Sequence, residues 1–142
     1  MTPVSPGSAA PAIPGATVGT GTVAVLFYKV TCPTCQVVAP VAERLADAAD
    51  RFVAVAQDPP ERIEEFGREF DTSFPSLSEA PPYEVSNAYG IRTVPTVFAV
   101  EDGTVVDVAE SWDRQGWNRV AATLGLGPVS HEGDGLPPFR PG

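Results

Sequence analysis

The sequence predicts an α/β domain with a mixed, mainly parallel sheet and helices on both faces. Short runs rich in Val, Ala and aromatic residues alternate with segments of helical periodicity, an order that favours a parallel sheet. Further along the chain, two such runs are joined by Asp102-Gly103, which indicates an antiparallel hairpin. With 142 residues, the chain is long enough for one domain with its own core.

The predicted elements are, in order, strand 22–30, helix 33–49, strand 52–57, helix 58–70, strand 74–77, helix 84–90, a hairpin over 94–110 and helix 113–124. The first two strands are continuous apolar runs, which is typical of strands buried on both faces. Because connections between such units are short, the strands should lie side by side, with the hairpin as an antiparallel edge.

Local signals support each predicted helix. The first helix carries Val38 and Leu45 on one apolar face. The second begins with Asp58 as its expected N-cap and Glu61 in the capping-box position. Gly90 is expected to close the short third helix. These signals fix where the helices begin and end, and so which loops follow the strands.

Both ends of the chain are predicted to be disordered, so the folded domain is expected over residues 22–126. Residues 1–21 are rich in Pro, Gly and small side chains, and residues 127–142 offer little apolar surface to pack. No stretch resembles a signal peptide or reaches the length of a membrane span. A cytoplasmic location is therefore expected, with an extracytoplasmic one as the alternative if the start or the export route is atypical.

The charge balance excludes some classes of partner. Nine Lys and Arg residues stand against 18 Asp and Glu residues, which gives a formal net charge of −9. No basic run or patch is visible, so neither nucleic-acid binding nor attraction to an anionic membrane is expected. An acidic surface of this kind otherwise indicates only good solvation.

The segment "KVTCPTCQ" contains both cysteines of the chain, Cys32 and Cys35. A structural zinc site takes four ligands, and beyond this pair the chain offers only His131. As a staple, the pair would constrain little of the unfolded chain. Cys32, however, stands between a strand and a helix, where backbone N–H groups and the helix dipole lower the pKa of a thiol. Reversible dithiol–disulfide chemistry is therefore predicted, with no metal or other cofactor.

Three features together resemble the thioredoxin fold. They are the CxxC at a strand–helix junction, Pro40 five residues after the second cysteine, and Val94-Pro95-Thr96 at the start of the hairpin. The resemblance covers most of residues 22–126. It implies that Cys32 attacks a disulfide and that Cys35 resolves the mixed disulfide.

The same resemblance implies where a partner binds. Pro95 would be cis and face the cysteines, while the backbone of Val94 would pair with an extended segment of the partner. Thr96 belongs to the same stretch, and Pro33 and Thr34 lie between the two cysteines. These five residues are the expected substrate-binding set.

The extra helix and strand between residues 60 and 77, before the proline strand, resemble the TlpA-type and peroxiredoxin-like branch of the superfamily. Thr31 and Thr34 stand where TlpA-type proteins carry Trp and Pro, so the direction of electron flow stays open. Leu26 replaces a buried Asp of thioredoxins, so the pKa of Cys35 should be high. Lys29 is a candidate source of positive charge near the Cys32 thiolate.

The predicted function is thiol–disulfide exchange with protein or small-molecule disulfides, supplied with electrons by an external thiol donor. Two alternatives stay open. One is a peroxiredoxin-like thiol peroxidase with antioxidant activity, although Lys29 and Val25 occupy that family's Thr and Pro positions and Arg92 is out of register. The other is a non-enzymatic binding module that uses the cysteine pair as a redox-sensitive latch.

Overall fold

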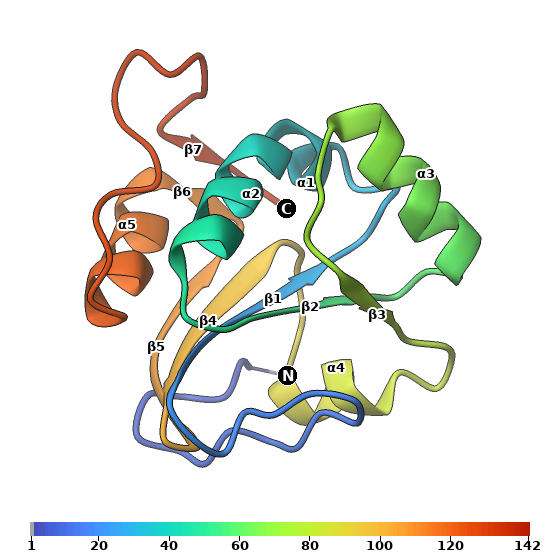
Figure 1. Ribbon diagram of the computed structural model, residues 1–142, viewed down its shortest axis with the longest axis vertical. Coiled ribbons are helices and arrows are strands. Elements are labelled where there is room, and N and C mark those ends of the chain that lie inside the picture. Colours follow the sequence, from blue (N-terminus) through green and yellow to red (C-terminus); the bar gives the residue numbers. More distant parts are fainter. Residues whose placement is uncertain (1) are drawn as a thin grey trace.

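The computed structural model describes residues 2–142 and is built around a five-stranded sheet in the order β3-β2-β1-β4-β5 (Figure 1). The strands are β1 (Thr22–Tyr28), β2 (Phe52–Ala56), β3 (Ser76–Ser78), β4 (Thr96–Glu101) and β5 (Thr104–Glu110). β1, β2 and β3 run parallel, and β4 pairs antiparallel with both β1 and β5. The predicted mixed sheet with its C-terminal hairpin is confirmed.

One face of the sheet is covered by α1 (Pro33–Val37), α2 (Ala39–Ala48), α3 (Pro60–Phe70) and α5 (Arg114–Thr123) (Figure 1). Side chains from these helices, such as Leu45, Phe66 and Trp117, form one buried cluster with alternate residues of the strands, such as Leu26. Burial of each such side chain contributes about 1.5–3 kcal/mol. This cluster fixes α1, and with it the cysteines, against the end of β1.

The opposite face is covered by α4 (Glu84–Tyr89) and by residues 2–21, here called the N-terminal segment. Ile13 and Val18 of this segment are only 4% and 6% exposed, and they pack in one cluster with Phe27 and Tyr89. The Tyr89 hydroxyl also donates a hydrogen bond to the Pro11 carbonyl oxygen at 2.7 Å. The N-terminal segment thus completes a core that α4 alone leaves open.

This packing corrects the prediction of disorder at the two ends. Residues 127–142, here called the C-terminal strap, turn back from α5 and add β7 (Phe139–Arg140) to β6 (Trp112–Asp113) as a two-stranded antiparallel sheet. The sequence gives no sign of either arrangement, because the few apolar residues stand singly among Pro and Gly and show no periodicity.

Two helix starts also differ from the prediction. The expected helix over 33–49 is broken at Val38 into α1 and α2, since Pro40 lacks an N–H and its ring would clash with a carbonyl one turn back. The N-cap of α3 is Pro59 rather than Asp58. The Asp58 carboxylate instead accepts a hydrogen bond from the Val30 N–H at 2.9 Å and so ties the loop before the cysteines.

In the part of the chain that the structure describes, no helix combines the length and the apolar character needed to cross a membrane.

Candidate active site

Cys32 is the N-cap of α1, at the end of the loop that follows β1. Its backbone is extended, with φ −80° and ψ 117°, and its sulfur accepts a hydrogen bond from the Cys35 N–H at 3.2 Å. Pro33 takes the first helical position, where a missing N–H is harmless. Cys32 is partly exposed whereas Cys35 is 3% exposed, so only the first sulfur is presented to a partner.

The surroundings of Cys32 lower its pKa to about 6. The largest cause is the hydrogen bond from the Cys35 thiol, and the backbone N–H groups of Cys35 and Thr34 add to it. The positive charge of Arg140 lowers the pKa further, while partial burial opposes the shift. A thiol with such a pKa is largely ionised at neutral pH, and the thiolate is the nucleophilic form.

The pKa of Cys35 is shifted the opposite way. Burial raises it most, and the neighbouring Cys32 sulfur and the Asp58 carboxylate raise it further. No acid at position 26 assists its ionisation, since Leu26 lies there in the core. The direction is the one expected from the sequence, and the pair therefore combines one ionised and one protonated sulfur.

The predicted substrate-binding residues approach the cysteines from the start of β4. The Val94-Pro95 peptide bond is cis, and the Cys32 thiol donates to the Val94 carbonyl oxygen at 3.5 Å. Pro95 lines a small hollow together with Cys35. Thr96 points elsewhere, because it is 1% exposed and its hydroxyl donates to the Thr93 carbonyl oxygen at 2.8 Å.

A scan against protein-family models and a search of curated proteins both find no match. Solved structures do match. The thioredoxin domain of a thiol–disulfide oxidoreductase from Bacteroides vulgatus has a TM-score of 0.68 at 20% identity, over 85% of this chain and 99% of that one. A thioredoxin-family thiol:disulfide interchange protein from Chlorobium tepidum has a TM-score of 0.65 at 19% identity, over 85% and 97%. MTB DsbF has a TM-score of 0.62 at 26% identity, over 75% and 82%.

The chain has a thioredoxin-like fold. The motifs that indicate it in the sequence, the CxxC and the Val-Pro-Thr stretch, lie together in space at the ends of β1 and β4. The resemblance drawn from the sequence is therefore confirmed at the level of fold.

Sequence reasoning missed one charged residue of this thioredoxin-like site. It singled out Lys29, but the cation that lowers the pKa of Cys32 is Arg140, which lies more than a hundred positions away in the strap. Among residues 2–142, Lys29 takes part in none of the five ion pairs. The pairing of β7 with β6 brings Arg140 to the cysteines, and no pattern in the sequence predicts that pairing.

Two further features bear on the chemistry available. The Arg92 guanidinium donates two hydrogen bonds of 2.8 Å to the Glu110 carboxylate, so it is engaged in an ion pair. In residues 2–142 no group of three or more His, Cys, Asp or Glu side chains is arranged to hold a metal ion.

Proposed function

We propose that this chain is a TlpA-type thiol–disulfide oxidoreductase that exchanges its Cys32–Cys35 pair with disulfides of proteins or small molecules. The observation that carries the proposal is the pairing of a partly exposed, low-pKa Cys32 with a buried Cys35 of raised pKa. The names of two structural neighbours, the thiol–disulfide oxidoreductase from Bacteroides vulgatus and the thiol:disulfide interchange protein from Chlorobium tepidum, support the same chemistry.

The exchange proceeds in two steps. The Cys32 thiolate attacks one sulfur of the partner disulfide, whose S–S bond breaks, and the other partner sulfur leaves as a thiolate that takes a proton from water. The Cys35 thiol then loses its proton, and its sulfur attacks Cys32 and releases the second partner thiolate. Two electrons pass from the pair to the partner. An external thiol donor restores the dithiol by the reverse exchange.

The burial of Cys35 determines which of the two sulfurs reacts first. Its raised pKa keeps it protonated while Cys32 attacks, so the wrong sulfur does not react first. Val94, Pro95 and the CxxC residues Pro33 and Thr34 would hold an extended partner segment across Cys32. Thr96 would act only by supporting the turn before β4, since its side chain is buried.

The single test is trapping combined with turnover. With a peptide disulfide and excess dithiothreitol, the parent chain should reduce many equivalents of substrate. Replacing Cys32 by Ser should abolish both reaction and trapping, because no nucleophile remains at the exposed position. Replacing Cys35 by Ser should slow turnover and, in a parallel incubation without dithiothreitol, accumulate a mixed disulfide on Cys32, detected by mass under non-reducing conditions.

A different result would redirect the assignment. A single equivalent reduced per chain would indicate a latch rather than a catalyst, and turnover of hydrogen peroxide without mixed disulfides would indicate a peroxidase. The reduction potential of the pair gives the direction of flow. A value near −270 mV suits a reductase, and a value toward −120 mV suits an oxidant of the extracytoplasmic kind.

A further inference from the structure

The C-terminal strap lies against Thr34, one of the two residues between the cysteines. The Thr34 hydroxyl donates a hydrogen bond to the Pro141 carbonyl oxygen at 2.6 Å and accepts one from Arg140 Nε at 2.9 Å. Thr34 is 3% exposed as a result, although it stands in the loop that should face a partner. The strap therefore covers part of the expected partner site.

The end of the strap also reaches the backbone of Val94. The Gly142 N–H donates to the Ser111 hydroxyl at 3.1 Å. A Cβ added at Gly142 would overlap the Val94 carbonyl oxygen and the Thr93 hydroxyl, so the two stretches of backbone are in close contact. The same Val94 carbonyl lies beside the Cys32 sulfur. A partner segment that paired with Val94 would meet this part of the strap.

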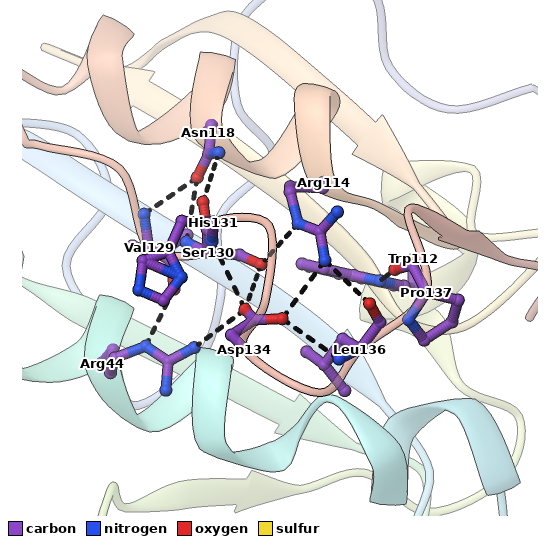
Figure 2. Close-up of polar contacts among 10 residues, drawn as sticks. All are labelled: Arg44, Trp112, Arg114, Asn118, Val129, Ser130, His131, Asp134, Leu136 and Pro137. Carbon is purple, nitrogen blue, oxygen red and sulfur yellow. Dashed lines mark hydrogen bonds and ion pairs between the residues drawn. The ribbon is translucent and has the colours of Figure 1, made fainter.

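The strap is anchored by polar contacts around Asp134, which precedes the residues that contact Thr34 (Figure 2). The Asp134 carboxylate accepts from the Ser130 hydroxyl at 2.5 Å and from Arg114 Nη2 at 3.2 Å, and Arg44 lies 3.7 Å away. Figure 2 shows that Arg44 comes from α2 and Arg114 from α5, so Asp134 links the strap to both helices.

Beyond this anchor, the strap buries little surface. Residues 137–142 are exposed or intermediate, and Phe139 is 56% exposed. Their bonds to the domain are those of the β6–β7 pair, the Arg114 N–H to the Pro138 carbonyl oxygen at 3.0 Å, the Trp112 indole N–H to the Pro137 carbonyl oxygen at 2.7 Å, and the contacts at Thr34 and Ser111. A segment held by few, exposed hydrogen bonds opens locally without unfolding of the domain.

We infer that the C-terminal strap is an autoinhibitory cover of the partner groove, which a protein disulfide must displace and a small disulfide does not. The inference rests on the proposed function. In the closed state, residues 140–142 occupy the positions beside Thr34 and Val94 that an extended polypeptide needs. The Cys32 sulfur stays partly exposed beside them, so a disulfide of a few atoms reaches it. If only a small fraction of the molecules has an open strap, the apparent affinity of the chain for a polypeptide is reduced in proportion to that fraction.

The test compares two disulfides of different size on the full-length chain. Rate constants for reduction of insulin and of hydroxyethyl disulfide are measured at about pH 8, above the pKa of about 6 that Cys32 has in the parent chain. Asp134→Asn removes the ion pairs of the anchor, with the exposed Asp47→Asn as its control. Ser130→Ala removes the bond of 2.5 Å from the Ser130 hydroxyl to the Asp134 carboxylate, with the exposed Ser8→Ala as its control.

Both strap variants should reduce insulin about tenfold faster than their controls. Loss of one hydrogen bond to a charged group changes the equilibrium between closed and open strap by about this factor. Their rates with hydroxyethyl disulfide should change less than about twofold, because small disulfides do not need the groove. Equal insulin rates in variants and controls, with both disulfides reduced, would overturn the cover and leave the oxidoreductase intact. If no form of the chain reduces either disulfide, the proposed function fails and the cover fails with it.

Discussion

The two ends of the chain pack on the same domain by opposite means. The N-terminal segment inserts Ile13 and Val18 into the core and completes one face of the sheet. The C-terminal strap is held mainly by Asp134 and its arginine, serine and backbone partners, and it lies over the cysteines. Val129 of the strap is buried as well, but the residues that follow it are held mostly by polar contacts, whereas the N-terminal segment is held by apolar burial.

The difference teaches which end belongs to the fold. Apolar side chains removed from water are lost only when the core itself opens, so the N-terminal segment should unfold together with the sheet. Exposed hydrogen bonds exchange with water at little net loss, since folding trades them against bonds to solvent. The strap should therefore open by itself while the domain stays folded.

The largest expected effect is that of Ile13→Ala. Truncating this buried side chain should lower the free energy of unfolding by about 2–5 kcal/mol, through lost burial and the cavity left between the segment and α4. Denaturant unfolding followed by circular dichroism measures it, with the exposed Thr17→Ala as control. Cys32 alkylation by iodoacetamide should keep its rate under native conditions. Equal stability of the two variants would mean that the N-terminal segment is not part of the core.

A smaller and more local effect is expected for Asn118→Ala. The Asn118 amide oxygen accepts from the N–H groups of Val129 and Ser130 at 2.8 and 3.2 Å, and its NH₂ donates to the Ser130 carbonyl at 2.8 Å. Loss of these bonds should lower the free energy of strap opening by about 1–3 kcal/mol. The global free energy of unfolding should fall by no more than the parent chain's free energy of strap opening, because the domain with an open strap is unaffected by the substitution.

Hydrogen exchange of the Trp112 indole N–H measures this opening, since that group is bonded to Pro137 of the strap. Asn87→Ala serves as control, because Asn87 makes a comparable exposed bond to the Pro82 carbonyl far from the strap. A loss of global stability in Asn118→Ala that exceeds the parent chain's free energy of strap opening would show that the strap is an integral part of the fold.

The sequence predicts most of the sheet and the cysteine site, for identifiable reasons. Strands β1 and β2 are continuous apolar runs, and Asp102-Gly103 has the residues that the hairpin turn demands, with φ 47° and 80°. Cys32 and Cys35 are recognisable because their spacing and their position before a helix are local properties. Features decided within a few residues of sequence are thus readable.

Features decided by long-range contact are not. Arg140 reaches Thr34 only because β7 pairs with β6, and Asp58 gives up its expected cap because the Val30 N–H competes for its carboxylate. The burial of Ile13 likewise depends on a sheet face that only the assembled fold presents. In each case the partner lies far along the chain, and neither periodicity nor turn chemistry encodes it.

The smallest expected effect, confined to acid, is a pH-dependent release of the strap. The pKa of Asp134 is lowered from 3.8 to about 2, first by the hydrogen bond from Ser130 and then by backbone N–H groups and Arg114. Arg44 and Arg114 face it from α2 and α5, and His131 lies on its own loop.

Because the folded-state pKa is the lower one, the Asp134 contribution is present above about pH 4 and is lost as the pH falls through about 2. Residues 2–21 contain no Asp, Glu, His or Lys, and the Asp102 carboxylate reaches them only through an exposed bond from the Gly21 N–H, so the packing of Ile13 should depend less on pH. In NMR spectra, the Trp112 indole resonance should therefore change between about pH 4 and pH 2 before the Ile13 methyl resonances do. Asp134→Asn should abolish that separate step. Simultaneous change of both signals in the parent chain would mean that the two ends open as one unit. It would contradict the claim that the strap opens separately from the N-terminal segment.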